Sequence, residues 1–270
     1  MKFTKMHGCG NDYVYVNCFT ETVEDPAALA VKVSDRHFGI GSDGLILIKP
    51  SEITDCEMDI YNADGSRAAM CGNGIRCVAK YAYDNGIAKS DRIRIATASG
   101  VKELELRIEE GQVRFVRVDM GEPVISEDRS LSMGQFTFTF TPVSMGNPHA
   151  VLFLDPKRTP GAAVMELPIW EIGPYFEQRA GAPERVNAEF VEVIDEGTLQ
   201  MRVWERGSGE TLACGTGACA AAVAAMNSGR VPADVVLVRL RGGSLVVEWD
   251  RGSGHVFMTG PAETVFTGEI

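Results

Sequence analysis

Apolar and polar residues alternate with a period of two over much of this chain, a pattern typical of half-buried β-strands. The clearest runs are residues 92–95, 103–108, 112–118, 136–140, 190–194, 235–240 and 244–249. Glycine-containing turns separate several of these runs, for example Glu110-Gly111 and Arg241-Gly242-Gly243. The pattern therefore predicts a chain built mainly from strands joined by short turns.

Fewer segments have helical character. Residues 26–35 and 168–180 predict two short helices, and residues 72–85 and 215–228 predict two longer ones, each followed by a glycine. The last of these is rich in alanine and has little polar surface, so we expect sheet to bury it on several sides. The predicted fold is α/β of the α+β type. It has two pseudo-symmetric domains, each a curved, mostly antiparallel sheet wrapped around a central helix.

The two longer helices begin inside a sequence repeat. Residues 61–74 align with residues 204–217 at a constant offset of 143 residues, and each copy contains Cys-Gly-x-Gly followed by an apolar run. A weaker echo pairs Gly10-Asn11 with Gly146-Asn147, each just ahead of a strand. The repeat predicts an N-terminal half over residues 1–118, joined by a C-terminal strand at 260–270, and a C-terminal half over residues 119–259.

Composition and charge limit the partners and the cellular location that we expect for this chain. The 270 residues are 45% hydrophobic and 23% charged, with a net charge of −11. This charge disfavours nucleic acid or an anionic membrane as a partner. No apolar run approaches the roughly 20 residues of a membrane span, and the N-terminus lacks the apolar core of a signal peptide. Seven scattered cysteines argue against a disulfide framework, so we expect a reducing, cytoplasmic location.

The repeated cysteines, Cys71 and Cys214, carry the chemistry that the sequence suggests. A thiol at a helix N-terminus lies near unpaired N–H groups, which favour the thiolate and also bind carboxylates. One such loop suits a nucleophile, an anion nest or a redox thiol. Two related loops suit removal of a proton from one face of a carbon and its return to the other, as racemases and epimerases require. A non-catalytic thiol or anion-binding module remains an alternative of a different class.

The other cysteines predict ordinary structural roles. Cys18, Cys56, Cys77 and Cys219 are interpreted as core residues, because free cysteine is among the most buried residue types. Cys9 is expected in the core or in a pocket wall. Spacings of C-x5-C and C-x4-C, without C-x-x-C, do not favour a zinc site. Neither repeat matches a phosphate-binding or dinucleotide-binding loop. We therefore expect no metal and no nucleotide cofactor.

Several long motifs, taken in order, resemble the diaminopimelate epimerase family over essentially the whole chain. They are residues 6–13, 35–44, 61–66, 70–77, 145–149, 184–187, 204–207 and 213–217. The resemblance implies a cofactor-independent enzyme that interconverts LL- and meso-2,6-diaminopimelate for lysine and peptidoglycan synthesis. It also implies a site in the cleft between the two domains and a homodimer. Because the reaction requires water to be excluded, we separately expect the domains to close on the substrate.

The resemblance also implies roles for individual residues. Cys71 and Cys214 match the acid–base pair, with Cys71 the donor and Cys214 the acceptor in the usual assignment, and His149 and Glu205 match positions that influence the protonation of the thiols. The cradle for the reacting carboxylate matches Gly72, Asn73, Gly215 and Thr216. The contacts for the distal amino-acid end match Asn11, Asn62, Asn147, Asn187, Glu205 and Arg206. An arginine can bind that carboxylate bidentately, while amides and a carboxylate satisfy an ammonium.

Two features qualify the match. Some family members carry Gln where this chain has Gly44, so no side-chain contact is expected there. Proline or hydroxyproline racemases share the Cys-Gly-x-Gly elements, but they usually carry His where Asn73 stands. Asn62, Asn187 and Arg206 favour a substrate with two amino-acid heads.

Asp43 and Asp64, in glycine-rich turns, are interpreted as loop formers.

Overall fold

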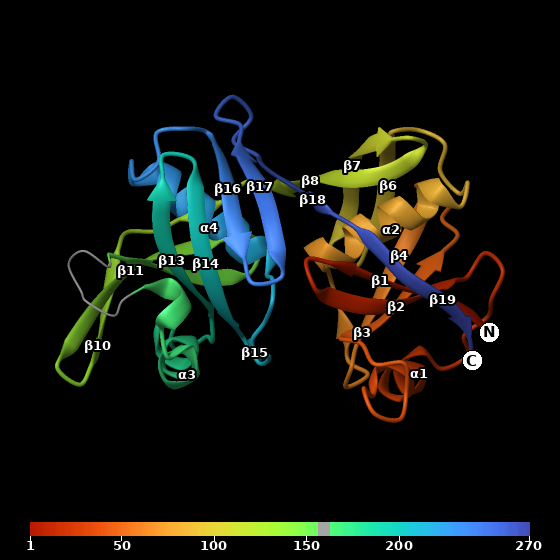
Figure 1. Cartoon of the computed structure of the whole chain (residues 1–270), viewed down its shortest axis with the longest axis horizontal. Helices are drawn as coiled ribbons and strands as arrows, with labels where there is room; N and C mark the ends of the chain where they lie inside the picture. The colour runs from red at the N-terminus through yellow and green to blue at the C-terminus, as the bar shows by residue number, and fades with distance from the viewer. Residues whose placement is uncertain (156–162) are drawn as a thin grey trace. The chain divides into compact units, whose positions relative to one another are not determined.

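The computed structural model describes residues 1–155 and 163–270, and they divide into two compact units (Figure 1). Unit 1 comprises residues 1–119 and 259–270, and unit 2 comprises residues 120–258. Two strands cross these limits: β8 (Gln112–Gly121) and β18 (Val256–Pro261).

Unit 1 is a mixed sheet with two helices. Its elements are β1 (Lys2–Gly8), β2 (Asn11–Asn17), α1 (Pro26–Ser34), β3 (Gly44–Lys49), β4 (Cys56–Asn62), β5 (Arg67–Ala68), α2 (Gly72–Asp84), β6 (Arg92–Thr97), β7 (Gly100–Glu109) and β19 (Glu263–Glu269), with most of β8. The strands pair in the order β19–β1–β2–β3–β4–β6–β7–β8. The β2–β3 and β4–β6 pairs are parallel and the other pairs are antiparallel.

Unit 2 repeats this plan. Its elements are β9 (Val124–Ile125), β10 (Arg129–Met133), β11 (Phe136–Ser144), β12 (Pro148–Leu154), a 3-10 turn η1 (Val164–Glu166), α3 (Ile169–Arg179), β13 (Asn187–Asp195), β14 (Thr198–Glu205), β15 (Gly209–Glu210), α4 (Gly215–Asn227), β16 (Val235–Leu240) and β17 (Gly243–Trp249). The strands pair in the order β10–β11–β12–β13–β14–β16–β17. Here β12–β13 and β14–β16 are the parallel pairs.

The two units are pseudo-symmetric, as predicted. α2 and α4 are each 13 residues long, and β6 and β16 are each six residues long at the same sequence offset as the helices. In each unit the parallel pairs fall at equivalent places in the sheet order. The predicted fold class is therefore confirmed, and each strand predicted from alternation lies within an observed one, whereas the predicted strand at 260–270 covers the end of β18 and all of β19.

Each sheet surrounds the central helix of its own unit. α2 contacts β1, β2, β4, β6 and β7, whereas α4 contacts β11, β12, β13, β14, β16 and β17 (Figure 1). In α4, every residue from Gly217 to Met226 is buried, which confirms the expectation from its alanine content. Small side chains let the surrounding strands approach the helix closely. The N-terminus of each central helix is therefore fixed by the sheet around it.

All four predicted helices are present, and each ends one residue earlier than predicted. The residues that follow their last turns, Asp35, Asn85, Ala180 and Ser228, are the C-caps of α1, α2, α3 and α4. The periodic pattern extends into a capping residue, because that residue is half inside the helix. None of the helices in residues 1–155 and 163–270 is long and apolar enough to cross a membrane.

Candidate active site

Cys71 is the N-cap of α2. Its backbone is extended, with φ −141°, and its Sγ accepts a hydrogen bond from the Gly74 N–H at 3.3 Å. The sulfur thus occupies the place where a Ser or Asp side chain usually caps a helix, beside the partial positive charge of the first turn. Cys71 is half-buried, so its thiol is protected but accessible.

A polar network at the start of β2 reaches the same thiol. The Cys71 thiol donates to Asn11 Oδ1 at 3.3 Å, and Asn11 Nδ2 donates to Asp43 Oδ2 at 2.7 Å. Arg36 contacts the other oxygen of Asp43 at 2.9 Å. Burial and the Asp12 charge raise the pKa of Asp43. Asp43 therefore does more than shape a turn, because it orients the Asn11 amide toward Cys71.

Three further residues of the unit 1 motifs lie on β2, α2 and β4, and of these Tyr13 interacts with Cys71. Tyr13 is buried, and burial followed by the charge of Cys71 raises its pKa well above the usual value. Asn73 is buried in the first turn of α2, after Gly72. Asn62, at the end of β4, donates to Ser66 Oγ at 3.0 Å and is half-exposed.

Gly44 is required by close packing. A Cβ built at this position would lie 2.2 Å from Tyr61 O and 2.9 Å from Tyr13 Cε1. Real Cβ atoms do not approach a backbone oxygen so closely, so any larger residue would shift the β3–β4 pair. No side-chain contact can arise from Gly44, as expected. Asp64, by contrast, accepts from Ser66 N at 2.9 Å within its own turn, which is the predicted loop-forming role.

Cys214 is the N-cap of α4 and repeats the geometry of Cys71. Its φ is −122°, and its Sγ accepts from Gly217 N–H at 3.4 Å. Its environment differs, because Cys214 is buried. Burial, then the charges of Glu205 and Glu189, raise the pKa of Cys214 well above the usual value, against the lowering effect of hydrogen bonds from Thr216 and Gly217. Water exclusion and negative charge therefore disfavour the Cys214 thiolate and make it a stronger base when it forms.

His149 is buried beside a carboxylate that the sequence analysis did not identify. Its Nδ1 lies 2.7 Å from Glu189 Oε1, and both side chains are fully buried. Its Nε2 lies 3.0 Å from Asn147 Oδ1. Asn147 Nδ2 donates to Thr216 Oγ1 at 3.3 Å, and that oxygen lies 3.5 Å from Cys214 Sγ. A continuous chain of polar contacts thus joins Glu189 to the thiol.

The remaining predicted residues of unit 2 lie where β13 and β14 meet the following loop. Asn187 Nδ2 donates to Pro148 O at 3.3 Å, and its Oδ1 accepts from the Arg206 backbone N–H at 2.9 Å. Glu205 accepts a hydrogen bond from the Thr211 hydroxyl. Gly215 begins α4 directly after Cys214. The Asn187 contact therefore holds the backbone at Arg206.

A second carboxylate, Glu177 of α3, supports the same loop. It accepts from Trp204 Nε1 at 2.8 Å and from Gly207 N at 2.9 Å. Arg185 also pairs with it. Glu177 lies 27 residues before Trp204 in the sequence, so no local pattern predicts that it supports this loop. Glu189 does leave a signal: it is a charged residue at a core-facing position of a strand.

The other cysteines are mostly inert core residues. Cys9, Cys56, Cys77 and Cys219 are buried, and the seven cysteines, all within the described residues, form no disulfide. Burial raises the pKa of Cys56 to about 12 and that of Cys77 to about 11, so neither is ionised near neutral pH. Cys18 differs from the expectation, because it is only partly buried and packs at the edge of a core cluster.

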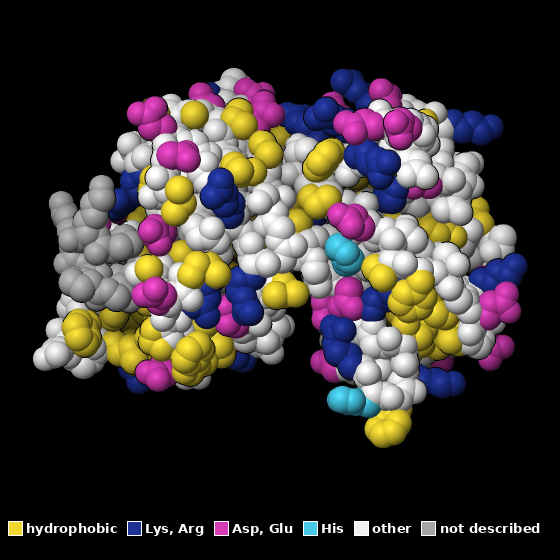
Figure 2. Space-filling model, in the orientation of Figure 1, with side chains coloured by type: hydrophobic (Ala, Val, Ile, Leu, Met, Phe, Trp, Pro, Cys, Tyr) yellow, Lys and Arg dark blue, Asp and Glu magenta, His cyan; other side chains and the backbone are white. Residues whose placement is uncertain are grey.

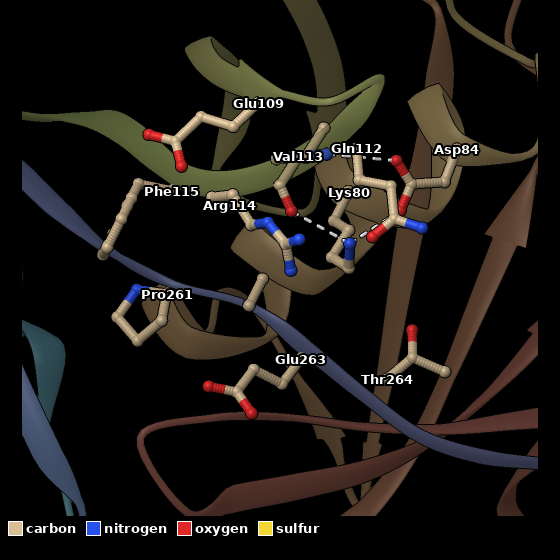
Figure 3. A pocket seen from close by; sticks show the side chains of 11 residues that line it. Lys80, Asp84, Glu109, Gln112, Val113, Arg114, Phe115, Pro261, Glu263 and Thr264 are labelled. Atoms are coloured by element: carbon tan, nitrogen blue, oxygen red, sulfur yellow. Dashed lines mark hydrogen bonds and ion pairs between the residues drawn. The ribbon is translucent and has the colours of Figure 1, made fainter.

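A cavity elsewhere in unit 1 contains none of the predicted site residues. It has a volume of about 510 Å³ and is lined by α2, β7, β8 and the segment from Pro261 to Thr264 (Figure 3). The Lys80 Nζ in its wall donates to Asp84 Oδ2 at 2.7 Å and to Val113 O at 2.9 Å. Lys80 is already paired, and the other charged residues of the wall, such as Arg114, do not include a repeated motif.

Metal and surface features add little to the site. In the two described stretches, no three His, Cys, Asp or Glu side chains gather as metal ligands. Acidic and basic side chains are interspersed on the face drawn in Figure 2. That face therefore carries no extended patch of one sign, the usual mark of a polyanion-binding surface.

Comparison with known proteins places the chain in a family. The profile of the family described as diaminopimelate epimerase matches residues 3–126 and 141–265. A protein of Acetivibrio thermocellus named diaminopimelate epimerase is 52% identical over 283 residues, covering 100% of this chain and 98% of that protein. One of Methanococcus maripaludis with the same name is 50% identical over 283 residues and covers 100% and 99%.

Solved structures share the fold at much lower identity. A PhzF-family phenazine biosynthesis protein of Bacillus anthracis has a TM-score of 0.76 at 16% identity, with coverage of 100% of this chain and 98% of that one. A hydroxyproline epimerase of Agrobacterium vitis has a TM-score of 0.71 at 17% identity, with coverage of 100% and 90%. These likenesses concern the fold alone. The profile match and the full-length relatives show that this chain belongs to the diaminopimelate epimerase family.

Proposed function

We propose that this chain interconverts LL- and meso-2,6-diaminopimelate, without a cofactor, by removing the α-proton to one thiolate and returning a proton from a second thiol on the opposite face. The observation that carries the proposal is that Cys71 and Cys214 each cap a central helix in pseudo-symmetric units. Full-length relatives with this name, at about half identity, support the substrate. The proposal requires both thiols to reach one stereocentre from opposite faces.

In the proposed reaction, one thiolate removes the α-proton and the opposite thiol returns a proton to the other face. Cys214 accepts and Cys71 donates in the assigned direction, and the roles exchange in reverse. A turnover near 10 s⁻¹ corresponds to a barrier of roughly 16 kcal/mol, so the carbanion must be strongly stabilised. The N–H groups of Gly72, Asn73, Gly215 and Thr216 at the helix N-termini would supply that stabilisation at the substrate carboxylate.

The distal head of the substrate would be held by a second polar set. Arg206 would bind its carboxylate bidentately, and Glu205 with the amides of Asn11, Asn62, Asn147 and Asn187 would hold its ammonium. His149 and Glu205 would influence the protonation of the thiols. A proline-type substrate has no second head, so this set distinguishes the proposal from a proline or hydroxyproline racemase.

Exchange of the α-proton in deuterated water tests the proposal. LL-Diaminopimelate should gain α-deuterium and L-proline should not, because only the former engages both polar sets. C71S and C214S should each reduce exchange by several orders of magnitude, since either removes one partner of the proton transfer. C18S, a partly buried cysteine elsewhere in unit 1, is the matched control and should remain active.

Two outcomes would contradict the proposal. Exchange of proline but not of diaminopimelate would indicate a racemase of the other kind. Full activity in both C71S and C214S would indicate a thiol or anion-binding module whose cysteines do no chemistry.

The setting that fits this activity is a homodimer in a reducing cytoplasm, acting on a small molecule and not on nucleic acid. Seven free cysteines and the net charge of −11 support the compartment and the absence of a polyanionic partner. The dimer rests on the family resemblance. Sedimentation equilibrium at micromolar concentration would reveal a monomer if the dimer assignment is wrong.

A further inference from the structure

The buried pair of His149 and Glu189 lies on neighbouring parallel strands of unit 2. In the β12–β13 register, His149 stands opposite Asn187, two residues before Glu189 on the same face. The Nδ1–Oε1 distance is 2.7 Å, and both side chains are fully buried. A carboxylate buried to this degree is stable only if a partner donates hydrogen bonds that replace those it made with water.

Both ring nitrogens of His149 face oxygen acceptors. Nδ1 faces the Glu189 carboxylate and Nε2 faces Asn147 Oδ1 at 3.0 Å, while the Asn147 amide nitrogen is engaged with Thr216. An ionised carboxylate and an amide oxygen only accept hydrogen bonds. The Glu189 carboxylate therefore forms this contact as a hydrogen bond only when Nδ1 carries the hydrogen.

Unit 1 shows that the fold itself does not need a charge at this place. Ile46 on β3 corresponds to Glu189, and Tyr13, opposite Gly44, corresponds to His149. A Cβ on Gly74 would lie 2.7 Å from Ile46 Cδ1, and a Cβ on Gly217 would lie 2.7 Å from Glu189 Oε1. The same packing position is apolar beside one thiol and acidic beside the other. The acidic residue is thus explained by chemistry and not by packing.

We propose that Glu189 is a positioning residue of the Cys214 site. Its carboxylate keeps a hydrogen on His149 Nδ1 and fixes the ring, and the ring in turn fixes the Asn147 amide and the Thr216 hydroxyl next to Cys214 Sγ. Glu189 does not touch the substrate in this proposal. It acts on the reaction through His149, in the way that a buried carboxylate orients the histidine of a hydrolase triad.

The groups that face this pair are few. Cys214 faces it from the N-cap of α4 and Glu205 faces Cys214 from the end of β14, and both Glu205 and Glu189 disfavour the Cys214 thiolate. Among the described residues, Glu189 Oε2 has no hydrogen-bond partner. The hydrogen on Nδ1 is therefore the main hydrogen-bond donor that offsets the desolvation of this carboxylate. Replacing Glu189 removes the acceptor that keeps the hydrogen on Nδ1.

The direct test is ¹⁵N NMR of histidine-labelled protein at pH 7, without substrate. The chain has four histidines, and H149Q assigns the signal of interest. In the wild type, Nδ1 should carry hydrogen. In E189Q the glutamine NH₂ should turn toward Nδ1, and in E189I no acceptor remains, so Nδ1 should lose its hydrogen in both variants. E192Q, on the same strand, should leave the His149 signals unchanged.

The kinetic test rests on the proposed function. E189Q and E189I should lower kcat for diaminopimelate at least about 10-fold, as loss of an orienting partner commonly does, with KM changed less than about 3-fold. E192Q should keep the wild-type kcat. Ile46 indicates that E189I packs acceptably, and E189Q preserves the shape of the side chain if E189I does not fold.

The two tests fail separately. A hydrogen that persists on Nδ1 in both variants, or an unchanged kcat with an altered Nδ1, would overturn the positioning role. A wild-type chain that is inactive on diaminopimelate would overturn the proposed function, and the NMR comparison would then still decide whether Glu189 holds the His149 hydrogen.

Discussion

At the scale of single residues, the two repeated cysteines are alike in geometry and unlike in electrostatics. Both sulfurs accept a hydrogen bond from the third residue of the helix that they cap. Cys71 is half-buried and donates to an amide oxygen, whereas Cys214 is buried near two carboxylates. One motif therefore places two thiols in different electrostatic surroundings, and burial with nearby carboxylates raises the pKa of Cys214.

Removing the Glu205 charge should make Cys214 more acidic. Burial is the largest cause that raises the pKa of Cys214 and the Glu205 charge is the next, so E205Q should lower this pKa. The thiolate would then form at lower pH. Alkylation of Cys214 by iodoacetamide, followed by peptide mass spectrometry across pH, should show its midpoint shifted downward in E205Q.

E192Q is a suitable control for this shift, because Glu192 lies on β13 and hydrogen-bonds Val164 N. Its midpoint should match that of the wild type. An unchanged or higher midpoint in E205Q would mean that Glu205 does not act on Cys214 through its charge.

Some residues of the candidate site are readable from the chain and some are not. Cys71 and Cys214 are identified by the repeat, and Asn147, Thr216 and Cys214 form one polar chain in the structure. Asp43 was interpreted only as a loop former, yet its carboxylate orients Asn11. Its partner lies 32 residues away, and no local pattern reports a contact made across a parallel strand pair.

At the scale of elements, each catalytic-candidate thiol is positioned by the N-terminus of a central helix that the sheet of its unit surrounds. The Cys-Gly-x-Gly pattern, followed by an apolar run and a glycine, predicted both helix starts, because capping and periodicity are local properties. The order of strands was not predicted in detail. Two parallel pairs interrupt each sheet, and their crossovers depend on the way the helix packs back onto the strands.

The glycines at the third position of the two central helices, Gly74 and Gly217, should respond differently to alanine. In G74A the added Cβ meets Ile46 Cδ1, the flexible end of a side chain, and alanine favours the helix, so the free energy of unfolding should change by less than about 1 kcal/mol. In G217A the Cβ meets the Glu189 carboxylate held by His149. Overpacking there should lower the free energy of unfolding by about 1–3 kcal/mol.

Urea denaturation of both variants measures this difference directly. Each variant serves as the control for the other, because both add one methyl group at the same helix position. An equal loss of unfolding free energy in the two variants would show that the Glu189 side chain beside Gly217 moves aside as easily as the Ile46 side chain beside Gly74.

At the scale of the whole molecule, the proposed function requires the two thiols to serve one substrate. If they do, mild oxidation of the substrate-free protein should join Cys71 to Cys214 and abolish activity, and a reductant should restore it. Mass spectrometry of the oxidised protein, digested without reduction, would identify the linked peptides. C71S and C214S should yield no such link.

An oxidised wild-type protein without a Cys71–Cys214 link would count against a shared site. The five other cysteines give an internal check, because four of them are buried. Links among those would indicate unfolding during oxidation and would call for milder conditions.

The sequence by itself determined the strands, the four helices, the duplicated architecture and the two capping thiols. These follow from residue periodicity, glycine placement and a repeat, all of which act over short stretches of chain. Only the tertiary structure decided the environment of each thiol: the His149–Glu189 pair, the Asp43–Asn11 contact, and the support that Glu177 gives to the Arg206 loop. Desolvation and charge pairing depend on which distant segments pack together, and a linear pattern does not encode that directly.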